Sequence, residues 1–80
     1  MPKAKKVRWA IKVVEYDGWV CVRVKGDHRQ YKHPTKPGVV TIPGHLNDTM
    51  SLDTQKSILR QAQITEEEAE RWNLLGDIGW

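Results

Sequence analysis

The sequence predicts a small domain of the α+β class, with a three-stranded antiparallel sheet packed against helices. Three observations predict it: helical periodicity towards both ends, alternation of apolar and charged residues between them, and a glycine turn inside the alternating region. The 80 residues, 39% hydrophobic and 29% charged, suit a single domain spanning residues 1–80. The expected order is α-β-β-β-α followed by a short tail helix.

Residues 4–16 are predicted to form the first helix, because apolar residues recur at helical spacing on two of its sides. One stripe contains Val7, Ala10, Ile11 and Val14, and the other contains Trp9, Val13 and Tyr16. We interpret the second stripe as a surface for a protein partner or, alternatively, as a face covered by the acidic end of the chain. Asp17-Gly18 is expected to end the helix, with the glycine in a left-handed conformation.

Residues 19–33 are predicted to form a β-hairpin around the turn Gly26-Asp27. This turn sets a register in which Lys25 faces His28, Arg23 faces Gln30 and Cys21 faces Lys32. Alternation then gives a core face with Val20, Val22, Val24 and Tyr31, and a cationic face with Arg23, Lys25, His28 and Lys32. Arg29 falls on the core side, but at the tip of the hairpin it can reach solvent.

The second half of the chain supplies the remaining elements. A turn over residues 34–38 leads to a third strand over residues 39–43, with Val40 and Ile42 facing the core. After a loop, Asp53 or Thr54 is expected to cap a second helix that directs Ile58, Leu59 and Ala62 inward. Thr65 and Glu68 form a capping box that starts a tail helix over about residues 65–76. Apolar residues indicate that this end packs on the body: Trp72, Leu74, Leu75, Ile78 and Trp80.

The charge is distributed unevenly along the chain. Residues 1–60 carry a net charge of +7, whereas residues 61–80 carry −4. A basic body predicts a polyanion such as nucleic acid as partner, with a merely solvated basic surface as the alternative. The sequence has no apolar run long enough for a membrane span, and its single cysteine, Cys21, cannot form an internal disulfide. We therefore expect a cytoplasmic protein that does not bind membranes.

His28 is the candidate catalytic residue of the cationic face. An unperturbed imidazole titrates at about pH 6.5, so it can accept or donate a proton near neutrality. RNA cleavage needs these proton transfers, because the 2′-hydroxyl must lose a proton and the departing 5′-oxygen must gain one. We assign Lys25 as a phosphate clamp and Arg23, Arg29 and Lys32 as further phosphate contacts. His33 and His45 have no predicted catalytic role.

Other chemistries find little support in the sequence. Cys21, His28, His33 and His45 do not have the spacing of a zinc site and fall on different faces of the predicted fold. Phosphate-loop and dinucleotide-binding motifs are absent as well. We therefore expect neither a metal nor a small-molecule cofactor.

Several motifs resemble the HicA family, the toxins of bacterial toxin–antitoxin modules. They are Asp17-Gly18-Trp19, Arg23, Gly26-x-His28, Tyr31-Lys32-His33-Pro34, Gly38-Val39-Val40-Thr41-Ile42-Pro43 and Ser57-Ile58-Leu59-Arg60-Gln61-Ala62. The resemblance spans about residues 6–75. It implies a fold like a double-stranded-RNA-binding domain and an mRNA interferase, a metal-independent endoribonuclease whose catalytic histidine corresponds to His28. It also implies a HicB-like antitoxin as protein partner.

The sequence departs from the family pattern at three places. Asp27 replaces the serine before the histidine, Asp53-Thr54-Gln55 replaces Gly-Thr-Leu, and Gln63 replaces a glycine. Asp27 could orient His28, or it could repel the scissile phosphate. The alternative function is therefore a non-catalytic RNA-binding module that uses the same basic face. A third interpretation is a protein-interaction domain that uses Trp9, Val13 and Tyr16.

Overall fold

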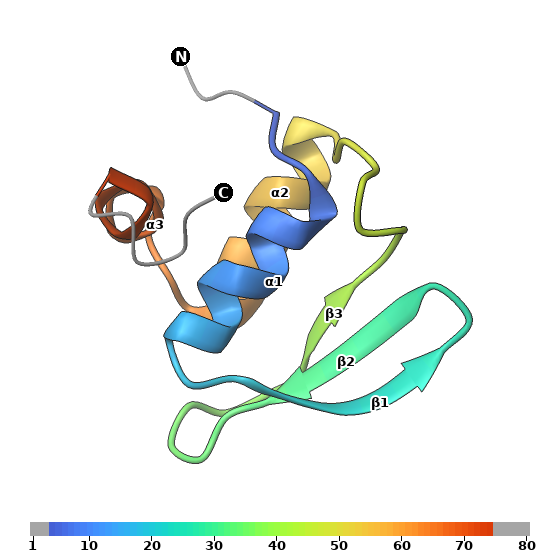
Figure 1. Ribbon diagram of the computed structural model, residues 1–80. Coiled ribbons are helices and arrows are strands. Elements are labelled where there is room, and N and C mark those ends of the chain that lie inside the picture. Colours follow the sequence, from blue (N-terminus) through green and yellow to red (C-terminus); the bar gives the residue numbers. More distant parts are fainter. Residues whose placement is uncertain (1–3, 75–80) are drawn as a thin grey trace.

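The computed structural model describes residues 4–74, which form a sheet with helices packed on one of its faces (Figure 1). The elements in chain order are α1 (Val7–Tyr16), β1 (Val20–Lys25), β2 (His28–Lys32), β3 (Val40–Ile42), α2 (Leu52–Ala62) and α3 (Glu66–Leu74). The strands are antiparallel and lie in the order β1-β2-β3, so β2 is central. This arrangement confirms the predicted α+β class and its order of elements.

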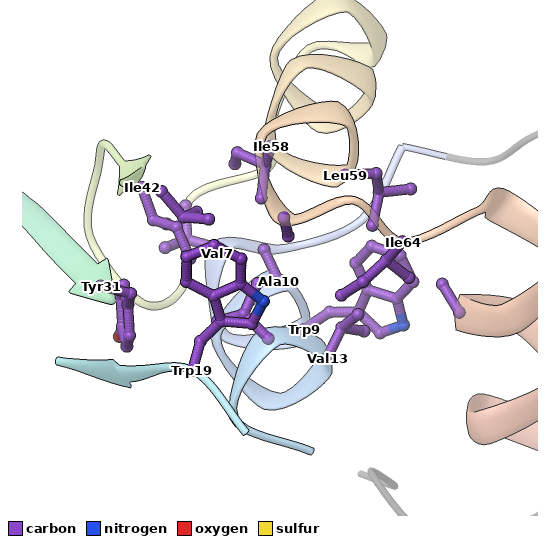
Figure 2. Packing of buried hydrophobic residues seen from close by; sticks show 14 of the residues in the cluster. Val7, Trp9, Ala10, Val13, Trp19, Tyr31, Ile42, Ile58, Leu59 and Ile64 are labelled. Carbon is purple, nitrogen blue, oxygen red and sulfur yellow. The ribbon is translucent and has the colours of Figure 1, made fainter. Parts of the chain in front are cut away.

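The core lies between the sheet and the two central helices, α1 and α2. Figure 2 shows Trp19, Tyr31 and Ile42 meeting Val7 and Ala10 of α1, with Ile58 and Leu59 reaching in from α2. Val40, Ile42, Ile58, Leu59 and Ala62 are all buried, as predicted. Each fully buried large apolar side chain contributes about 1.5–3 kcal/mol through its removal from water.

The second apolar stripe of α1 is largely covered by the C-terminal part of the chain. Trp9 and Val13 are 2% and 0% exposed and belong to the same buried cluster as Ile64, which is labelled with them in Figure 2. Ala69 of α3 belongs to this cluster as well. The expectation that Trp9 and Val13 form an open partner surface is therefore wrong, because these side chains complete the core. Tyr16 remains 49% exposed, although its ring lies 4.9 Å from that of Trp72.

Two helices begin at other residues than the sequence predicts. α1 starts at Val7 rather than residue 4, because Lys6 pairs with Thr49 in an isolated β-bridge. The Oγ of Ser51 caps α2 by accepting a hydrogen bond from the backbone N–H of Thr54 at 3.2 Å, so the cap is neither Asp53 nor Thr54.

The predicted capping box at the start of α3 is confirmed. The backbone N–H of Thr65 donates to Glu68 Oε1 at 3.0 Å, and the N–H of Glu68 donates to Thr65 Oγ1 at 3.1 Å. The Thr65 N–H bond, followed by the bond from its hydroxyl, lowers the pKa of the Glu68 carboxyl. Trp72 packs against the core as expected, whereas Leu75, Ile78, Trp80 and the predicted helix end at residue 76 lie outside the described residues. The described helices are all too short or too polar to span a membrane.

The hairpin follows the predicted register near its turn only. Lys25 faces His28 and Arg23 faces Gln30, and Gly26 has the positive φ, +61°, that a glycine-first turn requires. A β-bulge between Cys21 and Arg23 then shifts the pairing, so that Cys21 faces Tyr31 and not Lys32.

The predicted core face of β1 is also wrong. Val20, Val22 and Val24 are 60%, 56% and 61% exposed, whereas Tyr31 on the central strand is buried as predicted. β1 is an edge strand, and Figure 1 shows it farthest from α1 and α2, which pack on β3 instead. The hairpin thus projects beyond the helical layer and carries His28 at its tip.

Candidate functional site

His28 stands at the start of β2, directly after the hairpin turn, and its side chain is 57% exposed. Its Nδ1 lies 2.9 Å from Asp27 Oδ1. Because an ionised carboxylate can only accept hydrogen bonds, Nδ1 is the donor in this contact. The contact orients the ring and leaves Nε2 as the nitrogen of a neutral imidazole that can take a proton from a bound molecule.

A cleft of about 440 Å³ opens beside this histidine, and we call it the basic cleft. Its lining residues come from all three strands: Arg23, Lys25, His28, Gln30 and Thr41. The register explains the grouping, because Gln30 pairs with Arg23 on one side and with Thr41 on the other, while Lys25 pairs with His28 in the neighbouring row. The structure therefore brings three predicted site residues, Arg23, Lys25 and His28, into one cleft.

The other two predicted phosphate contacts lie elsewhere. Arg29 pairs with Ile42 and so shares the face of the sheet that carries the core. Its Nη1 donates to the carbonyl of Gly44 at 3.1 Å, so this guanidinium braces the loop after β3. Lys32 is exposed at the far end of β2, where it pairs with Val20.

A second cleft, of about 270 Å³, adjoins the first and is called the α2 cleft below. It is lined by His28, Thr41, Pro43, Thr54, Ser57, Ile58 and Gln61. His28 and Thr41 line both clefts, so the two form one groove with the imidazole between them. The α2 residues were not predicted as site residues, since they carry no charge. Ser57, Ile58 and Gln61 were marked only by the family resemblance of residues 57–62, and Thr54 only as part of a departure from the family pattern.

Gln61 connects α2 to the open edge of the sheet. Its Oε1 accepts a hydrogen bond from the backbone N–H of Thr41 at 2.8 Å, and its Nε2 donates to Ser57 Oγ at 3.2 Å. The first bond satisfies a backbone donor on the edge strand β3 that has no neighbouring strand. The hydrogen bond therefore fixes this part of the α2 cleft to β3, the strand next to the one that begins with His28.

His33 has a structural role at the base of the hairpin. Its Nδ1 accepts from the backbone N–H groups of Thr35, at 3.1 Å, and Lys36, at 3.0 Å, so its Nε2 carries the proton and donates to the carbonyl of Asp17 at 2.7 Å. Gly18, with a φ of +103°, packs against the His33 ring so closely that a Cβ at this position would lie 3.0 Å from His33 Nε2. His33 thereby ties the turn after β2 to the end of α1. His45 is exposed in the loop before α2 and lines neither cleft.

Apart from Arg23, Lys25 and His28, no titratable side chain in the described part of the chain lines the two clefts. Burial, followed by the charge of Cys21, raises the pKa of Tyr31 to about 12, so this phenol stays protonated at neutral pH. Within residues 4–74, no three His, Cys, Asp or Glu side chains gather closely enough to hold a metal ion. The groove thus combines one oriented imidazole, two cations and a neutral polar wall.

Comparison with known proteins identifies the family. A family model described as HicA toxin of bacterial toxin–antitoxin matches residues 7–64, which contain α1, the sheet and α2 and exclude α3. No curated protein matched the chain. The match covers most of the sequence, and the fold has the element order and three-stranded sheet that the motifs imply. On this evidence the chain belongs to the HicA toxin family.

Proposed function

We propose that this protein is a toxin-type endoribonuclease that cleaves mRNA, with His28 as its general acid/base. Membership of the HicA toxin family supports the class of activity. The observation that carries the assignment is the exposed imidazole of His28, held by Asp27 and facing a cleft that Arg23 and Lys25 also line.

The proposed reaction uses the 2′-hydroxyl of the RNA as nucleophile. His28 Nε2 takes the hydroxyl proton, the 2′-oxygen attacks the adjacent phosphorus, and the bond from phosphorus to the 5′-oxygen breaks. The departing 5′-oxygen gains a proton from the imidazolium or from water, leaving a 2′,3′-cyclic phosphate and a 5′-hydroxyl. Lys25 and Arg23 stabilise the negative charge that develops on the phosphoryl oxygens.

The direct test compares RNA cleavage by the parent protein and by His28→Ala, both in EDTA. Loss of general acid/base catalysis should slow cleavage by about 10²–10⁴-fold and abolish growth inhibition. The fold should survive, because the side chain is mostly exposed, and circular dichroism checks this. His45→Ala, which alters an exposed histidine outside the groove, serves as control.

Two outcomes would count against the proposal. If His28→Ala cleaves RNA as fast as the parent, His28 is not the acid/base. If the parent binds RNA but does not cleave it, the non-catalytic RNA-binding module becomes the better description.

We also propose that a HicB-like antitoxin neutralises the protein by covering this groove. A partner that blocks Arg23, Lys25 and His28 would be expected to present carboxylates to the basic cleft. Co-expression with the product of the neighbouring gene should yield a complex in which RNA cleavage is suppressed. If that product neither co-purifies nor inhibits, the proposed partner is wrong.

A further inference from the structure

We infer that the α2 cleft binds the base of an unpaired nucleotide next to the scissile phosphate. The inference rests on the proposed function for the position of the phosphate in the basic cleft. It assigns a ligand to the second half of the groove, the α2 cleft. On this assignment the protein recognises single-stranded RNA through a base, and not double-stranded RNA through its shape.

The lining of the α2 cleft suits a base better than a phosphate. Its side chains are all uncharged apart from His28, which it shares with the basic cleft. Pro43, which is partly exposed, provides apolar surface against which a flat ring can lie, while Thr54, Ser57 and Gln61 provide polar atoms for its edge. The charged half and the neutral half of the groove therefore match the two parts of a nucleotide.

The hydrogen bonds within the cleft leave its hydroxyl groups able to donate. Ser57 Oγ accepts from Gln61 Nε2 at 3.2 Å, and Thr54 Oγ1 accepts from Ser51 Oγ at 3.0 Å. In both contacts the cleft hydroxyl acts as acceptor, so its own proton remains for an acceptor atom on a base. Since Gln61 is held by Thr41, these donors stand on a preorganised wall.

His28 lines both clefts, and this determines in which order the phosphate and the base of a nucleotide lie along the groove. A phosphate in the basic cleft, beside Lys25, places the adjoining nucleotide across the imidazole and towards Ser57. A base can turn into the α2 cleft only if it is not paired, because pairing occupies the same polar edge. Cleavage should therefore require an unpaired base at this step.

The test measures binding of short 2′-O-methyl oligonucleotides, which lack the free 2′-hydroxyl that the reaction needs. A six-nucleotide strand with bases is compared with a strand of equal length and charge that lacks them. The parent should bind the strand with bases about 10-fold more tightly, which is the gain expected when a single base stacks on the protein. Ser57→Leu, which fills the cleft, and Thr54→Val should reduce this ratio while leaving affinity for the abasic strand unchanged.

Two comparisons make the result specific. Thr49→Val alters an exposed threonine outside the cleft and should keep the parent ratio, whereas Lys25→Ala should weaken both strands equally. Equal affinity of the parent for the two strands would overturn the inference. It would also be overturned if Ser57→Leu lowered the affinity for the strand with bases and for the abasic strand by the same factor. Because no cleavage is measured, a parent that fails to cut RNA disproves the proposed activity without deciding this test.

Discussion

At the scale of single residues, the contact between Asp27 and His28 is the feature on which the proposed chemistry depends most. Asp27 stands where the motifs of the family have a serine, and its charge could either orient the imidazole or repel a phosphate. The 2.9 Å contact between Asp27 Oδ1 and His28 Nδ1 favours orientation. Both side chains are about half exposed, so water weakens the interaction relative to a buried carboxylate–histidine pair.

Replacing Asp27 should therefore reduce activity moderately. We expect Asp27→Ala to lower kcat on the order of 10-fold with little change in KM, because an unheld ring presents Nε2 for only part of the time; an Asp→Asn change in a buried catalytic triad, which imposes the wrong tautomer, costs about 10⁴-fold. Asp27→Asn should lose at least as much activity, because its amide N–H can donate to Nδ1 and so keep the proton on Nε2, the nitrogen that has to accept one. Steady-state cleavage of a labelled RNA measures both, and faster cleavage by Asp27→Ala would instead indicate repulsion of the phosphate.

The histidines also show what a residue's position in the sequence can and cannot reveal. Alternation along the hairpin correctly separated His28 from His33, because a side chain changes face with every step along a strand. It could not reveal the Nδ1 contacts of His33 with Thr35 and Lys36, which depend on how the chain turns after the strand. Those contacts commit His33 to holding the hairpin.

At the scale of elements, the hairpin was predictable at its turn and not at its far end. Gly26-Asp27 determines the pairing of Lys25 with His28, since a two-residue loop allows one register. The bulge that brings Cys21 opposite Tyr31 leaves no mark in an alternating sequence. Alternation likewise predicts two faces for β1, but whether a helix covers one of them depends on the tertiary arrangement.

Lys36 joins three elements at the base of this hairpin. Its Nζ lies 2.6 Å from Asp17 Oδ2 at the end of α1, and 3.3 Å and 3.0 Å from the carbonyls of Ala62 and Gln63 at the end of α2. A cation at the C-terminus of a helix also interacts favourably with the helix dipole. The turn that follows β2 is thereby fixed to both helices of the core.

Removal of this cation should destabilise the protein. Lys36→Ala is expected to lower the free energy of unfolding by about 1–3 kcal/mol, because hydrogen bonds to a charged group are lost and Asp17 keeps a partly buried charge. Lys56→Ala, at an exposed position of α2, should change it by less than about 0.5 kcal/mol. Urea denaturation followed by tryptophan fluorescence measures both, and equal midpoints would contradict the proposed role of Lys36.

At the scale of the whole molecule, the sequence predicts the sheet, the helices and the distribution of charge, but it does not predict the full groove. Helical periodicity and capping residues give the elements, and the apolar positions of β3 and α2 identify the core. The groove adds Thr41 of β3 to Ser57 and Gln61 of α2, and these two elements, separate in the sequence, are joined where Gln61 accepts a hydrogen bond from the backbone of Thr41. Such a contact follows from the packing of α2 on β3, and no local pattern reports it.

The exposed basic surface of the sheet should make RNA binding strongly dependent on salt. Arg23, Lys25 and Lys32 are exposed on the strands, so up to three phosphates can be neutralised when single-stranded RNA lies along them. Each neutralised phosphate contributes about −0.7 to the slope of log K against log salt concentration, which predicts a slope of about −2.

Measurement of this slope needs RNA that stays intact, so binding is followed with the His28→Ala protein. In that background, Lys25→Ala should reduce the magnitude of the slope by about 0.7, because one fewer counterion is released when RNA binds. Lys12→Ala removes an exposed lysine of α1, away from the strands that line the groove, and should leave the slope unchanged. An affinity that does not vary with salt concentration would mean that the positively charged residues of these strands do not bind RNA phosphates. A protein partner would then be the better explanation for this basic face.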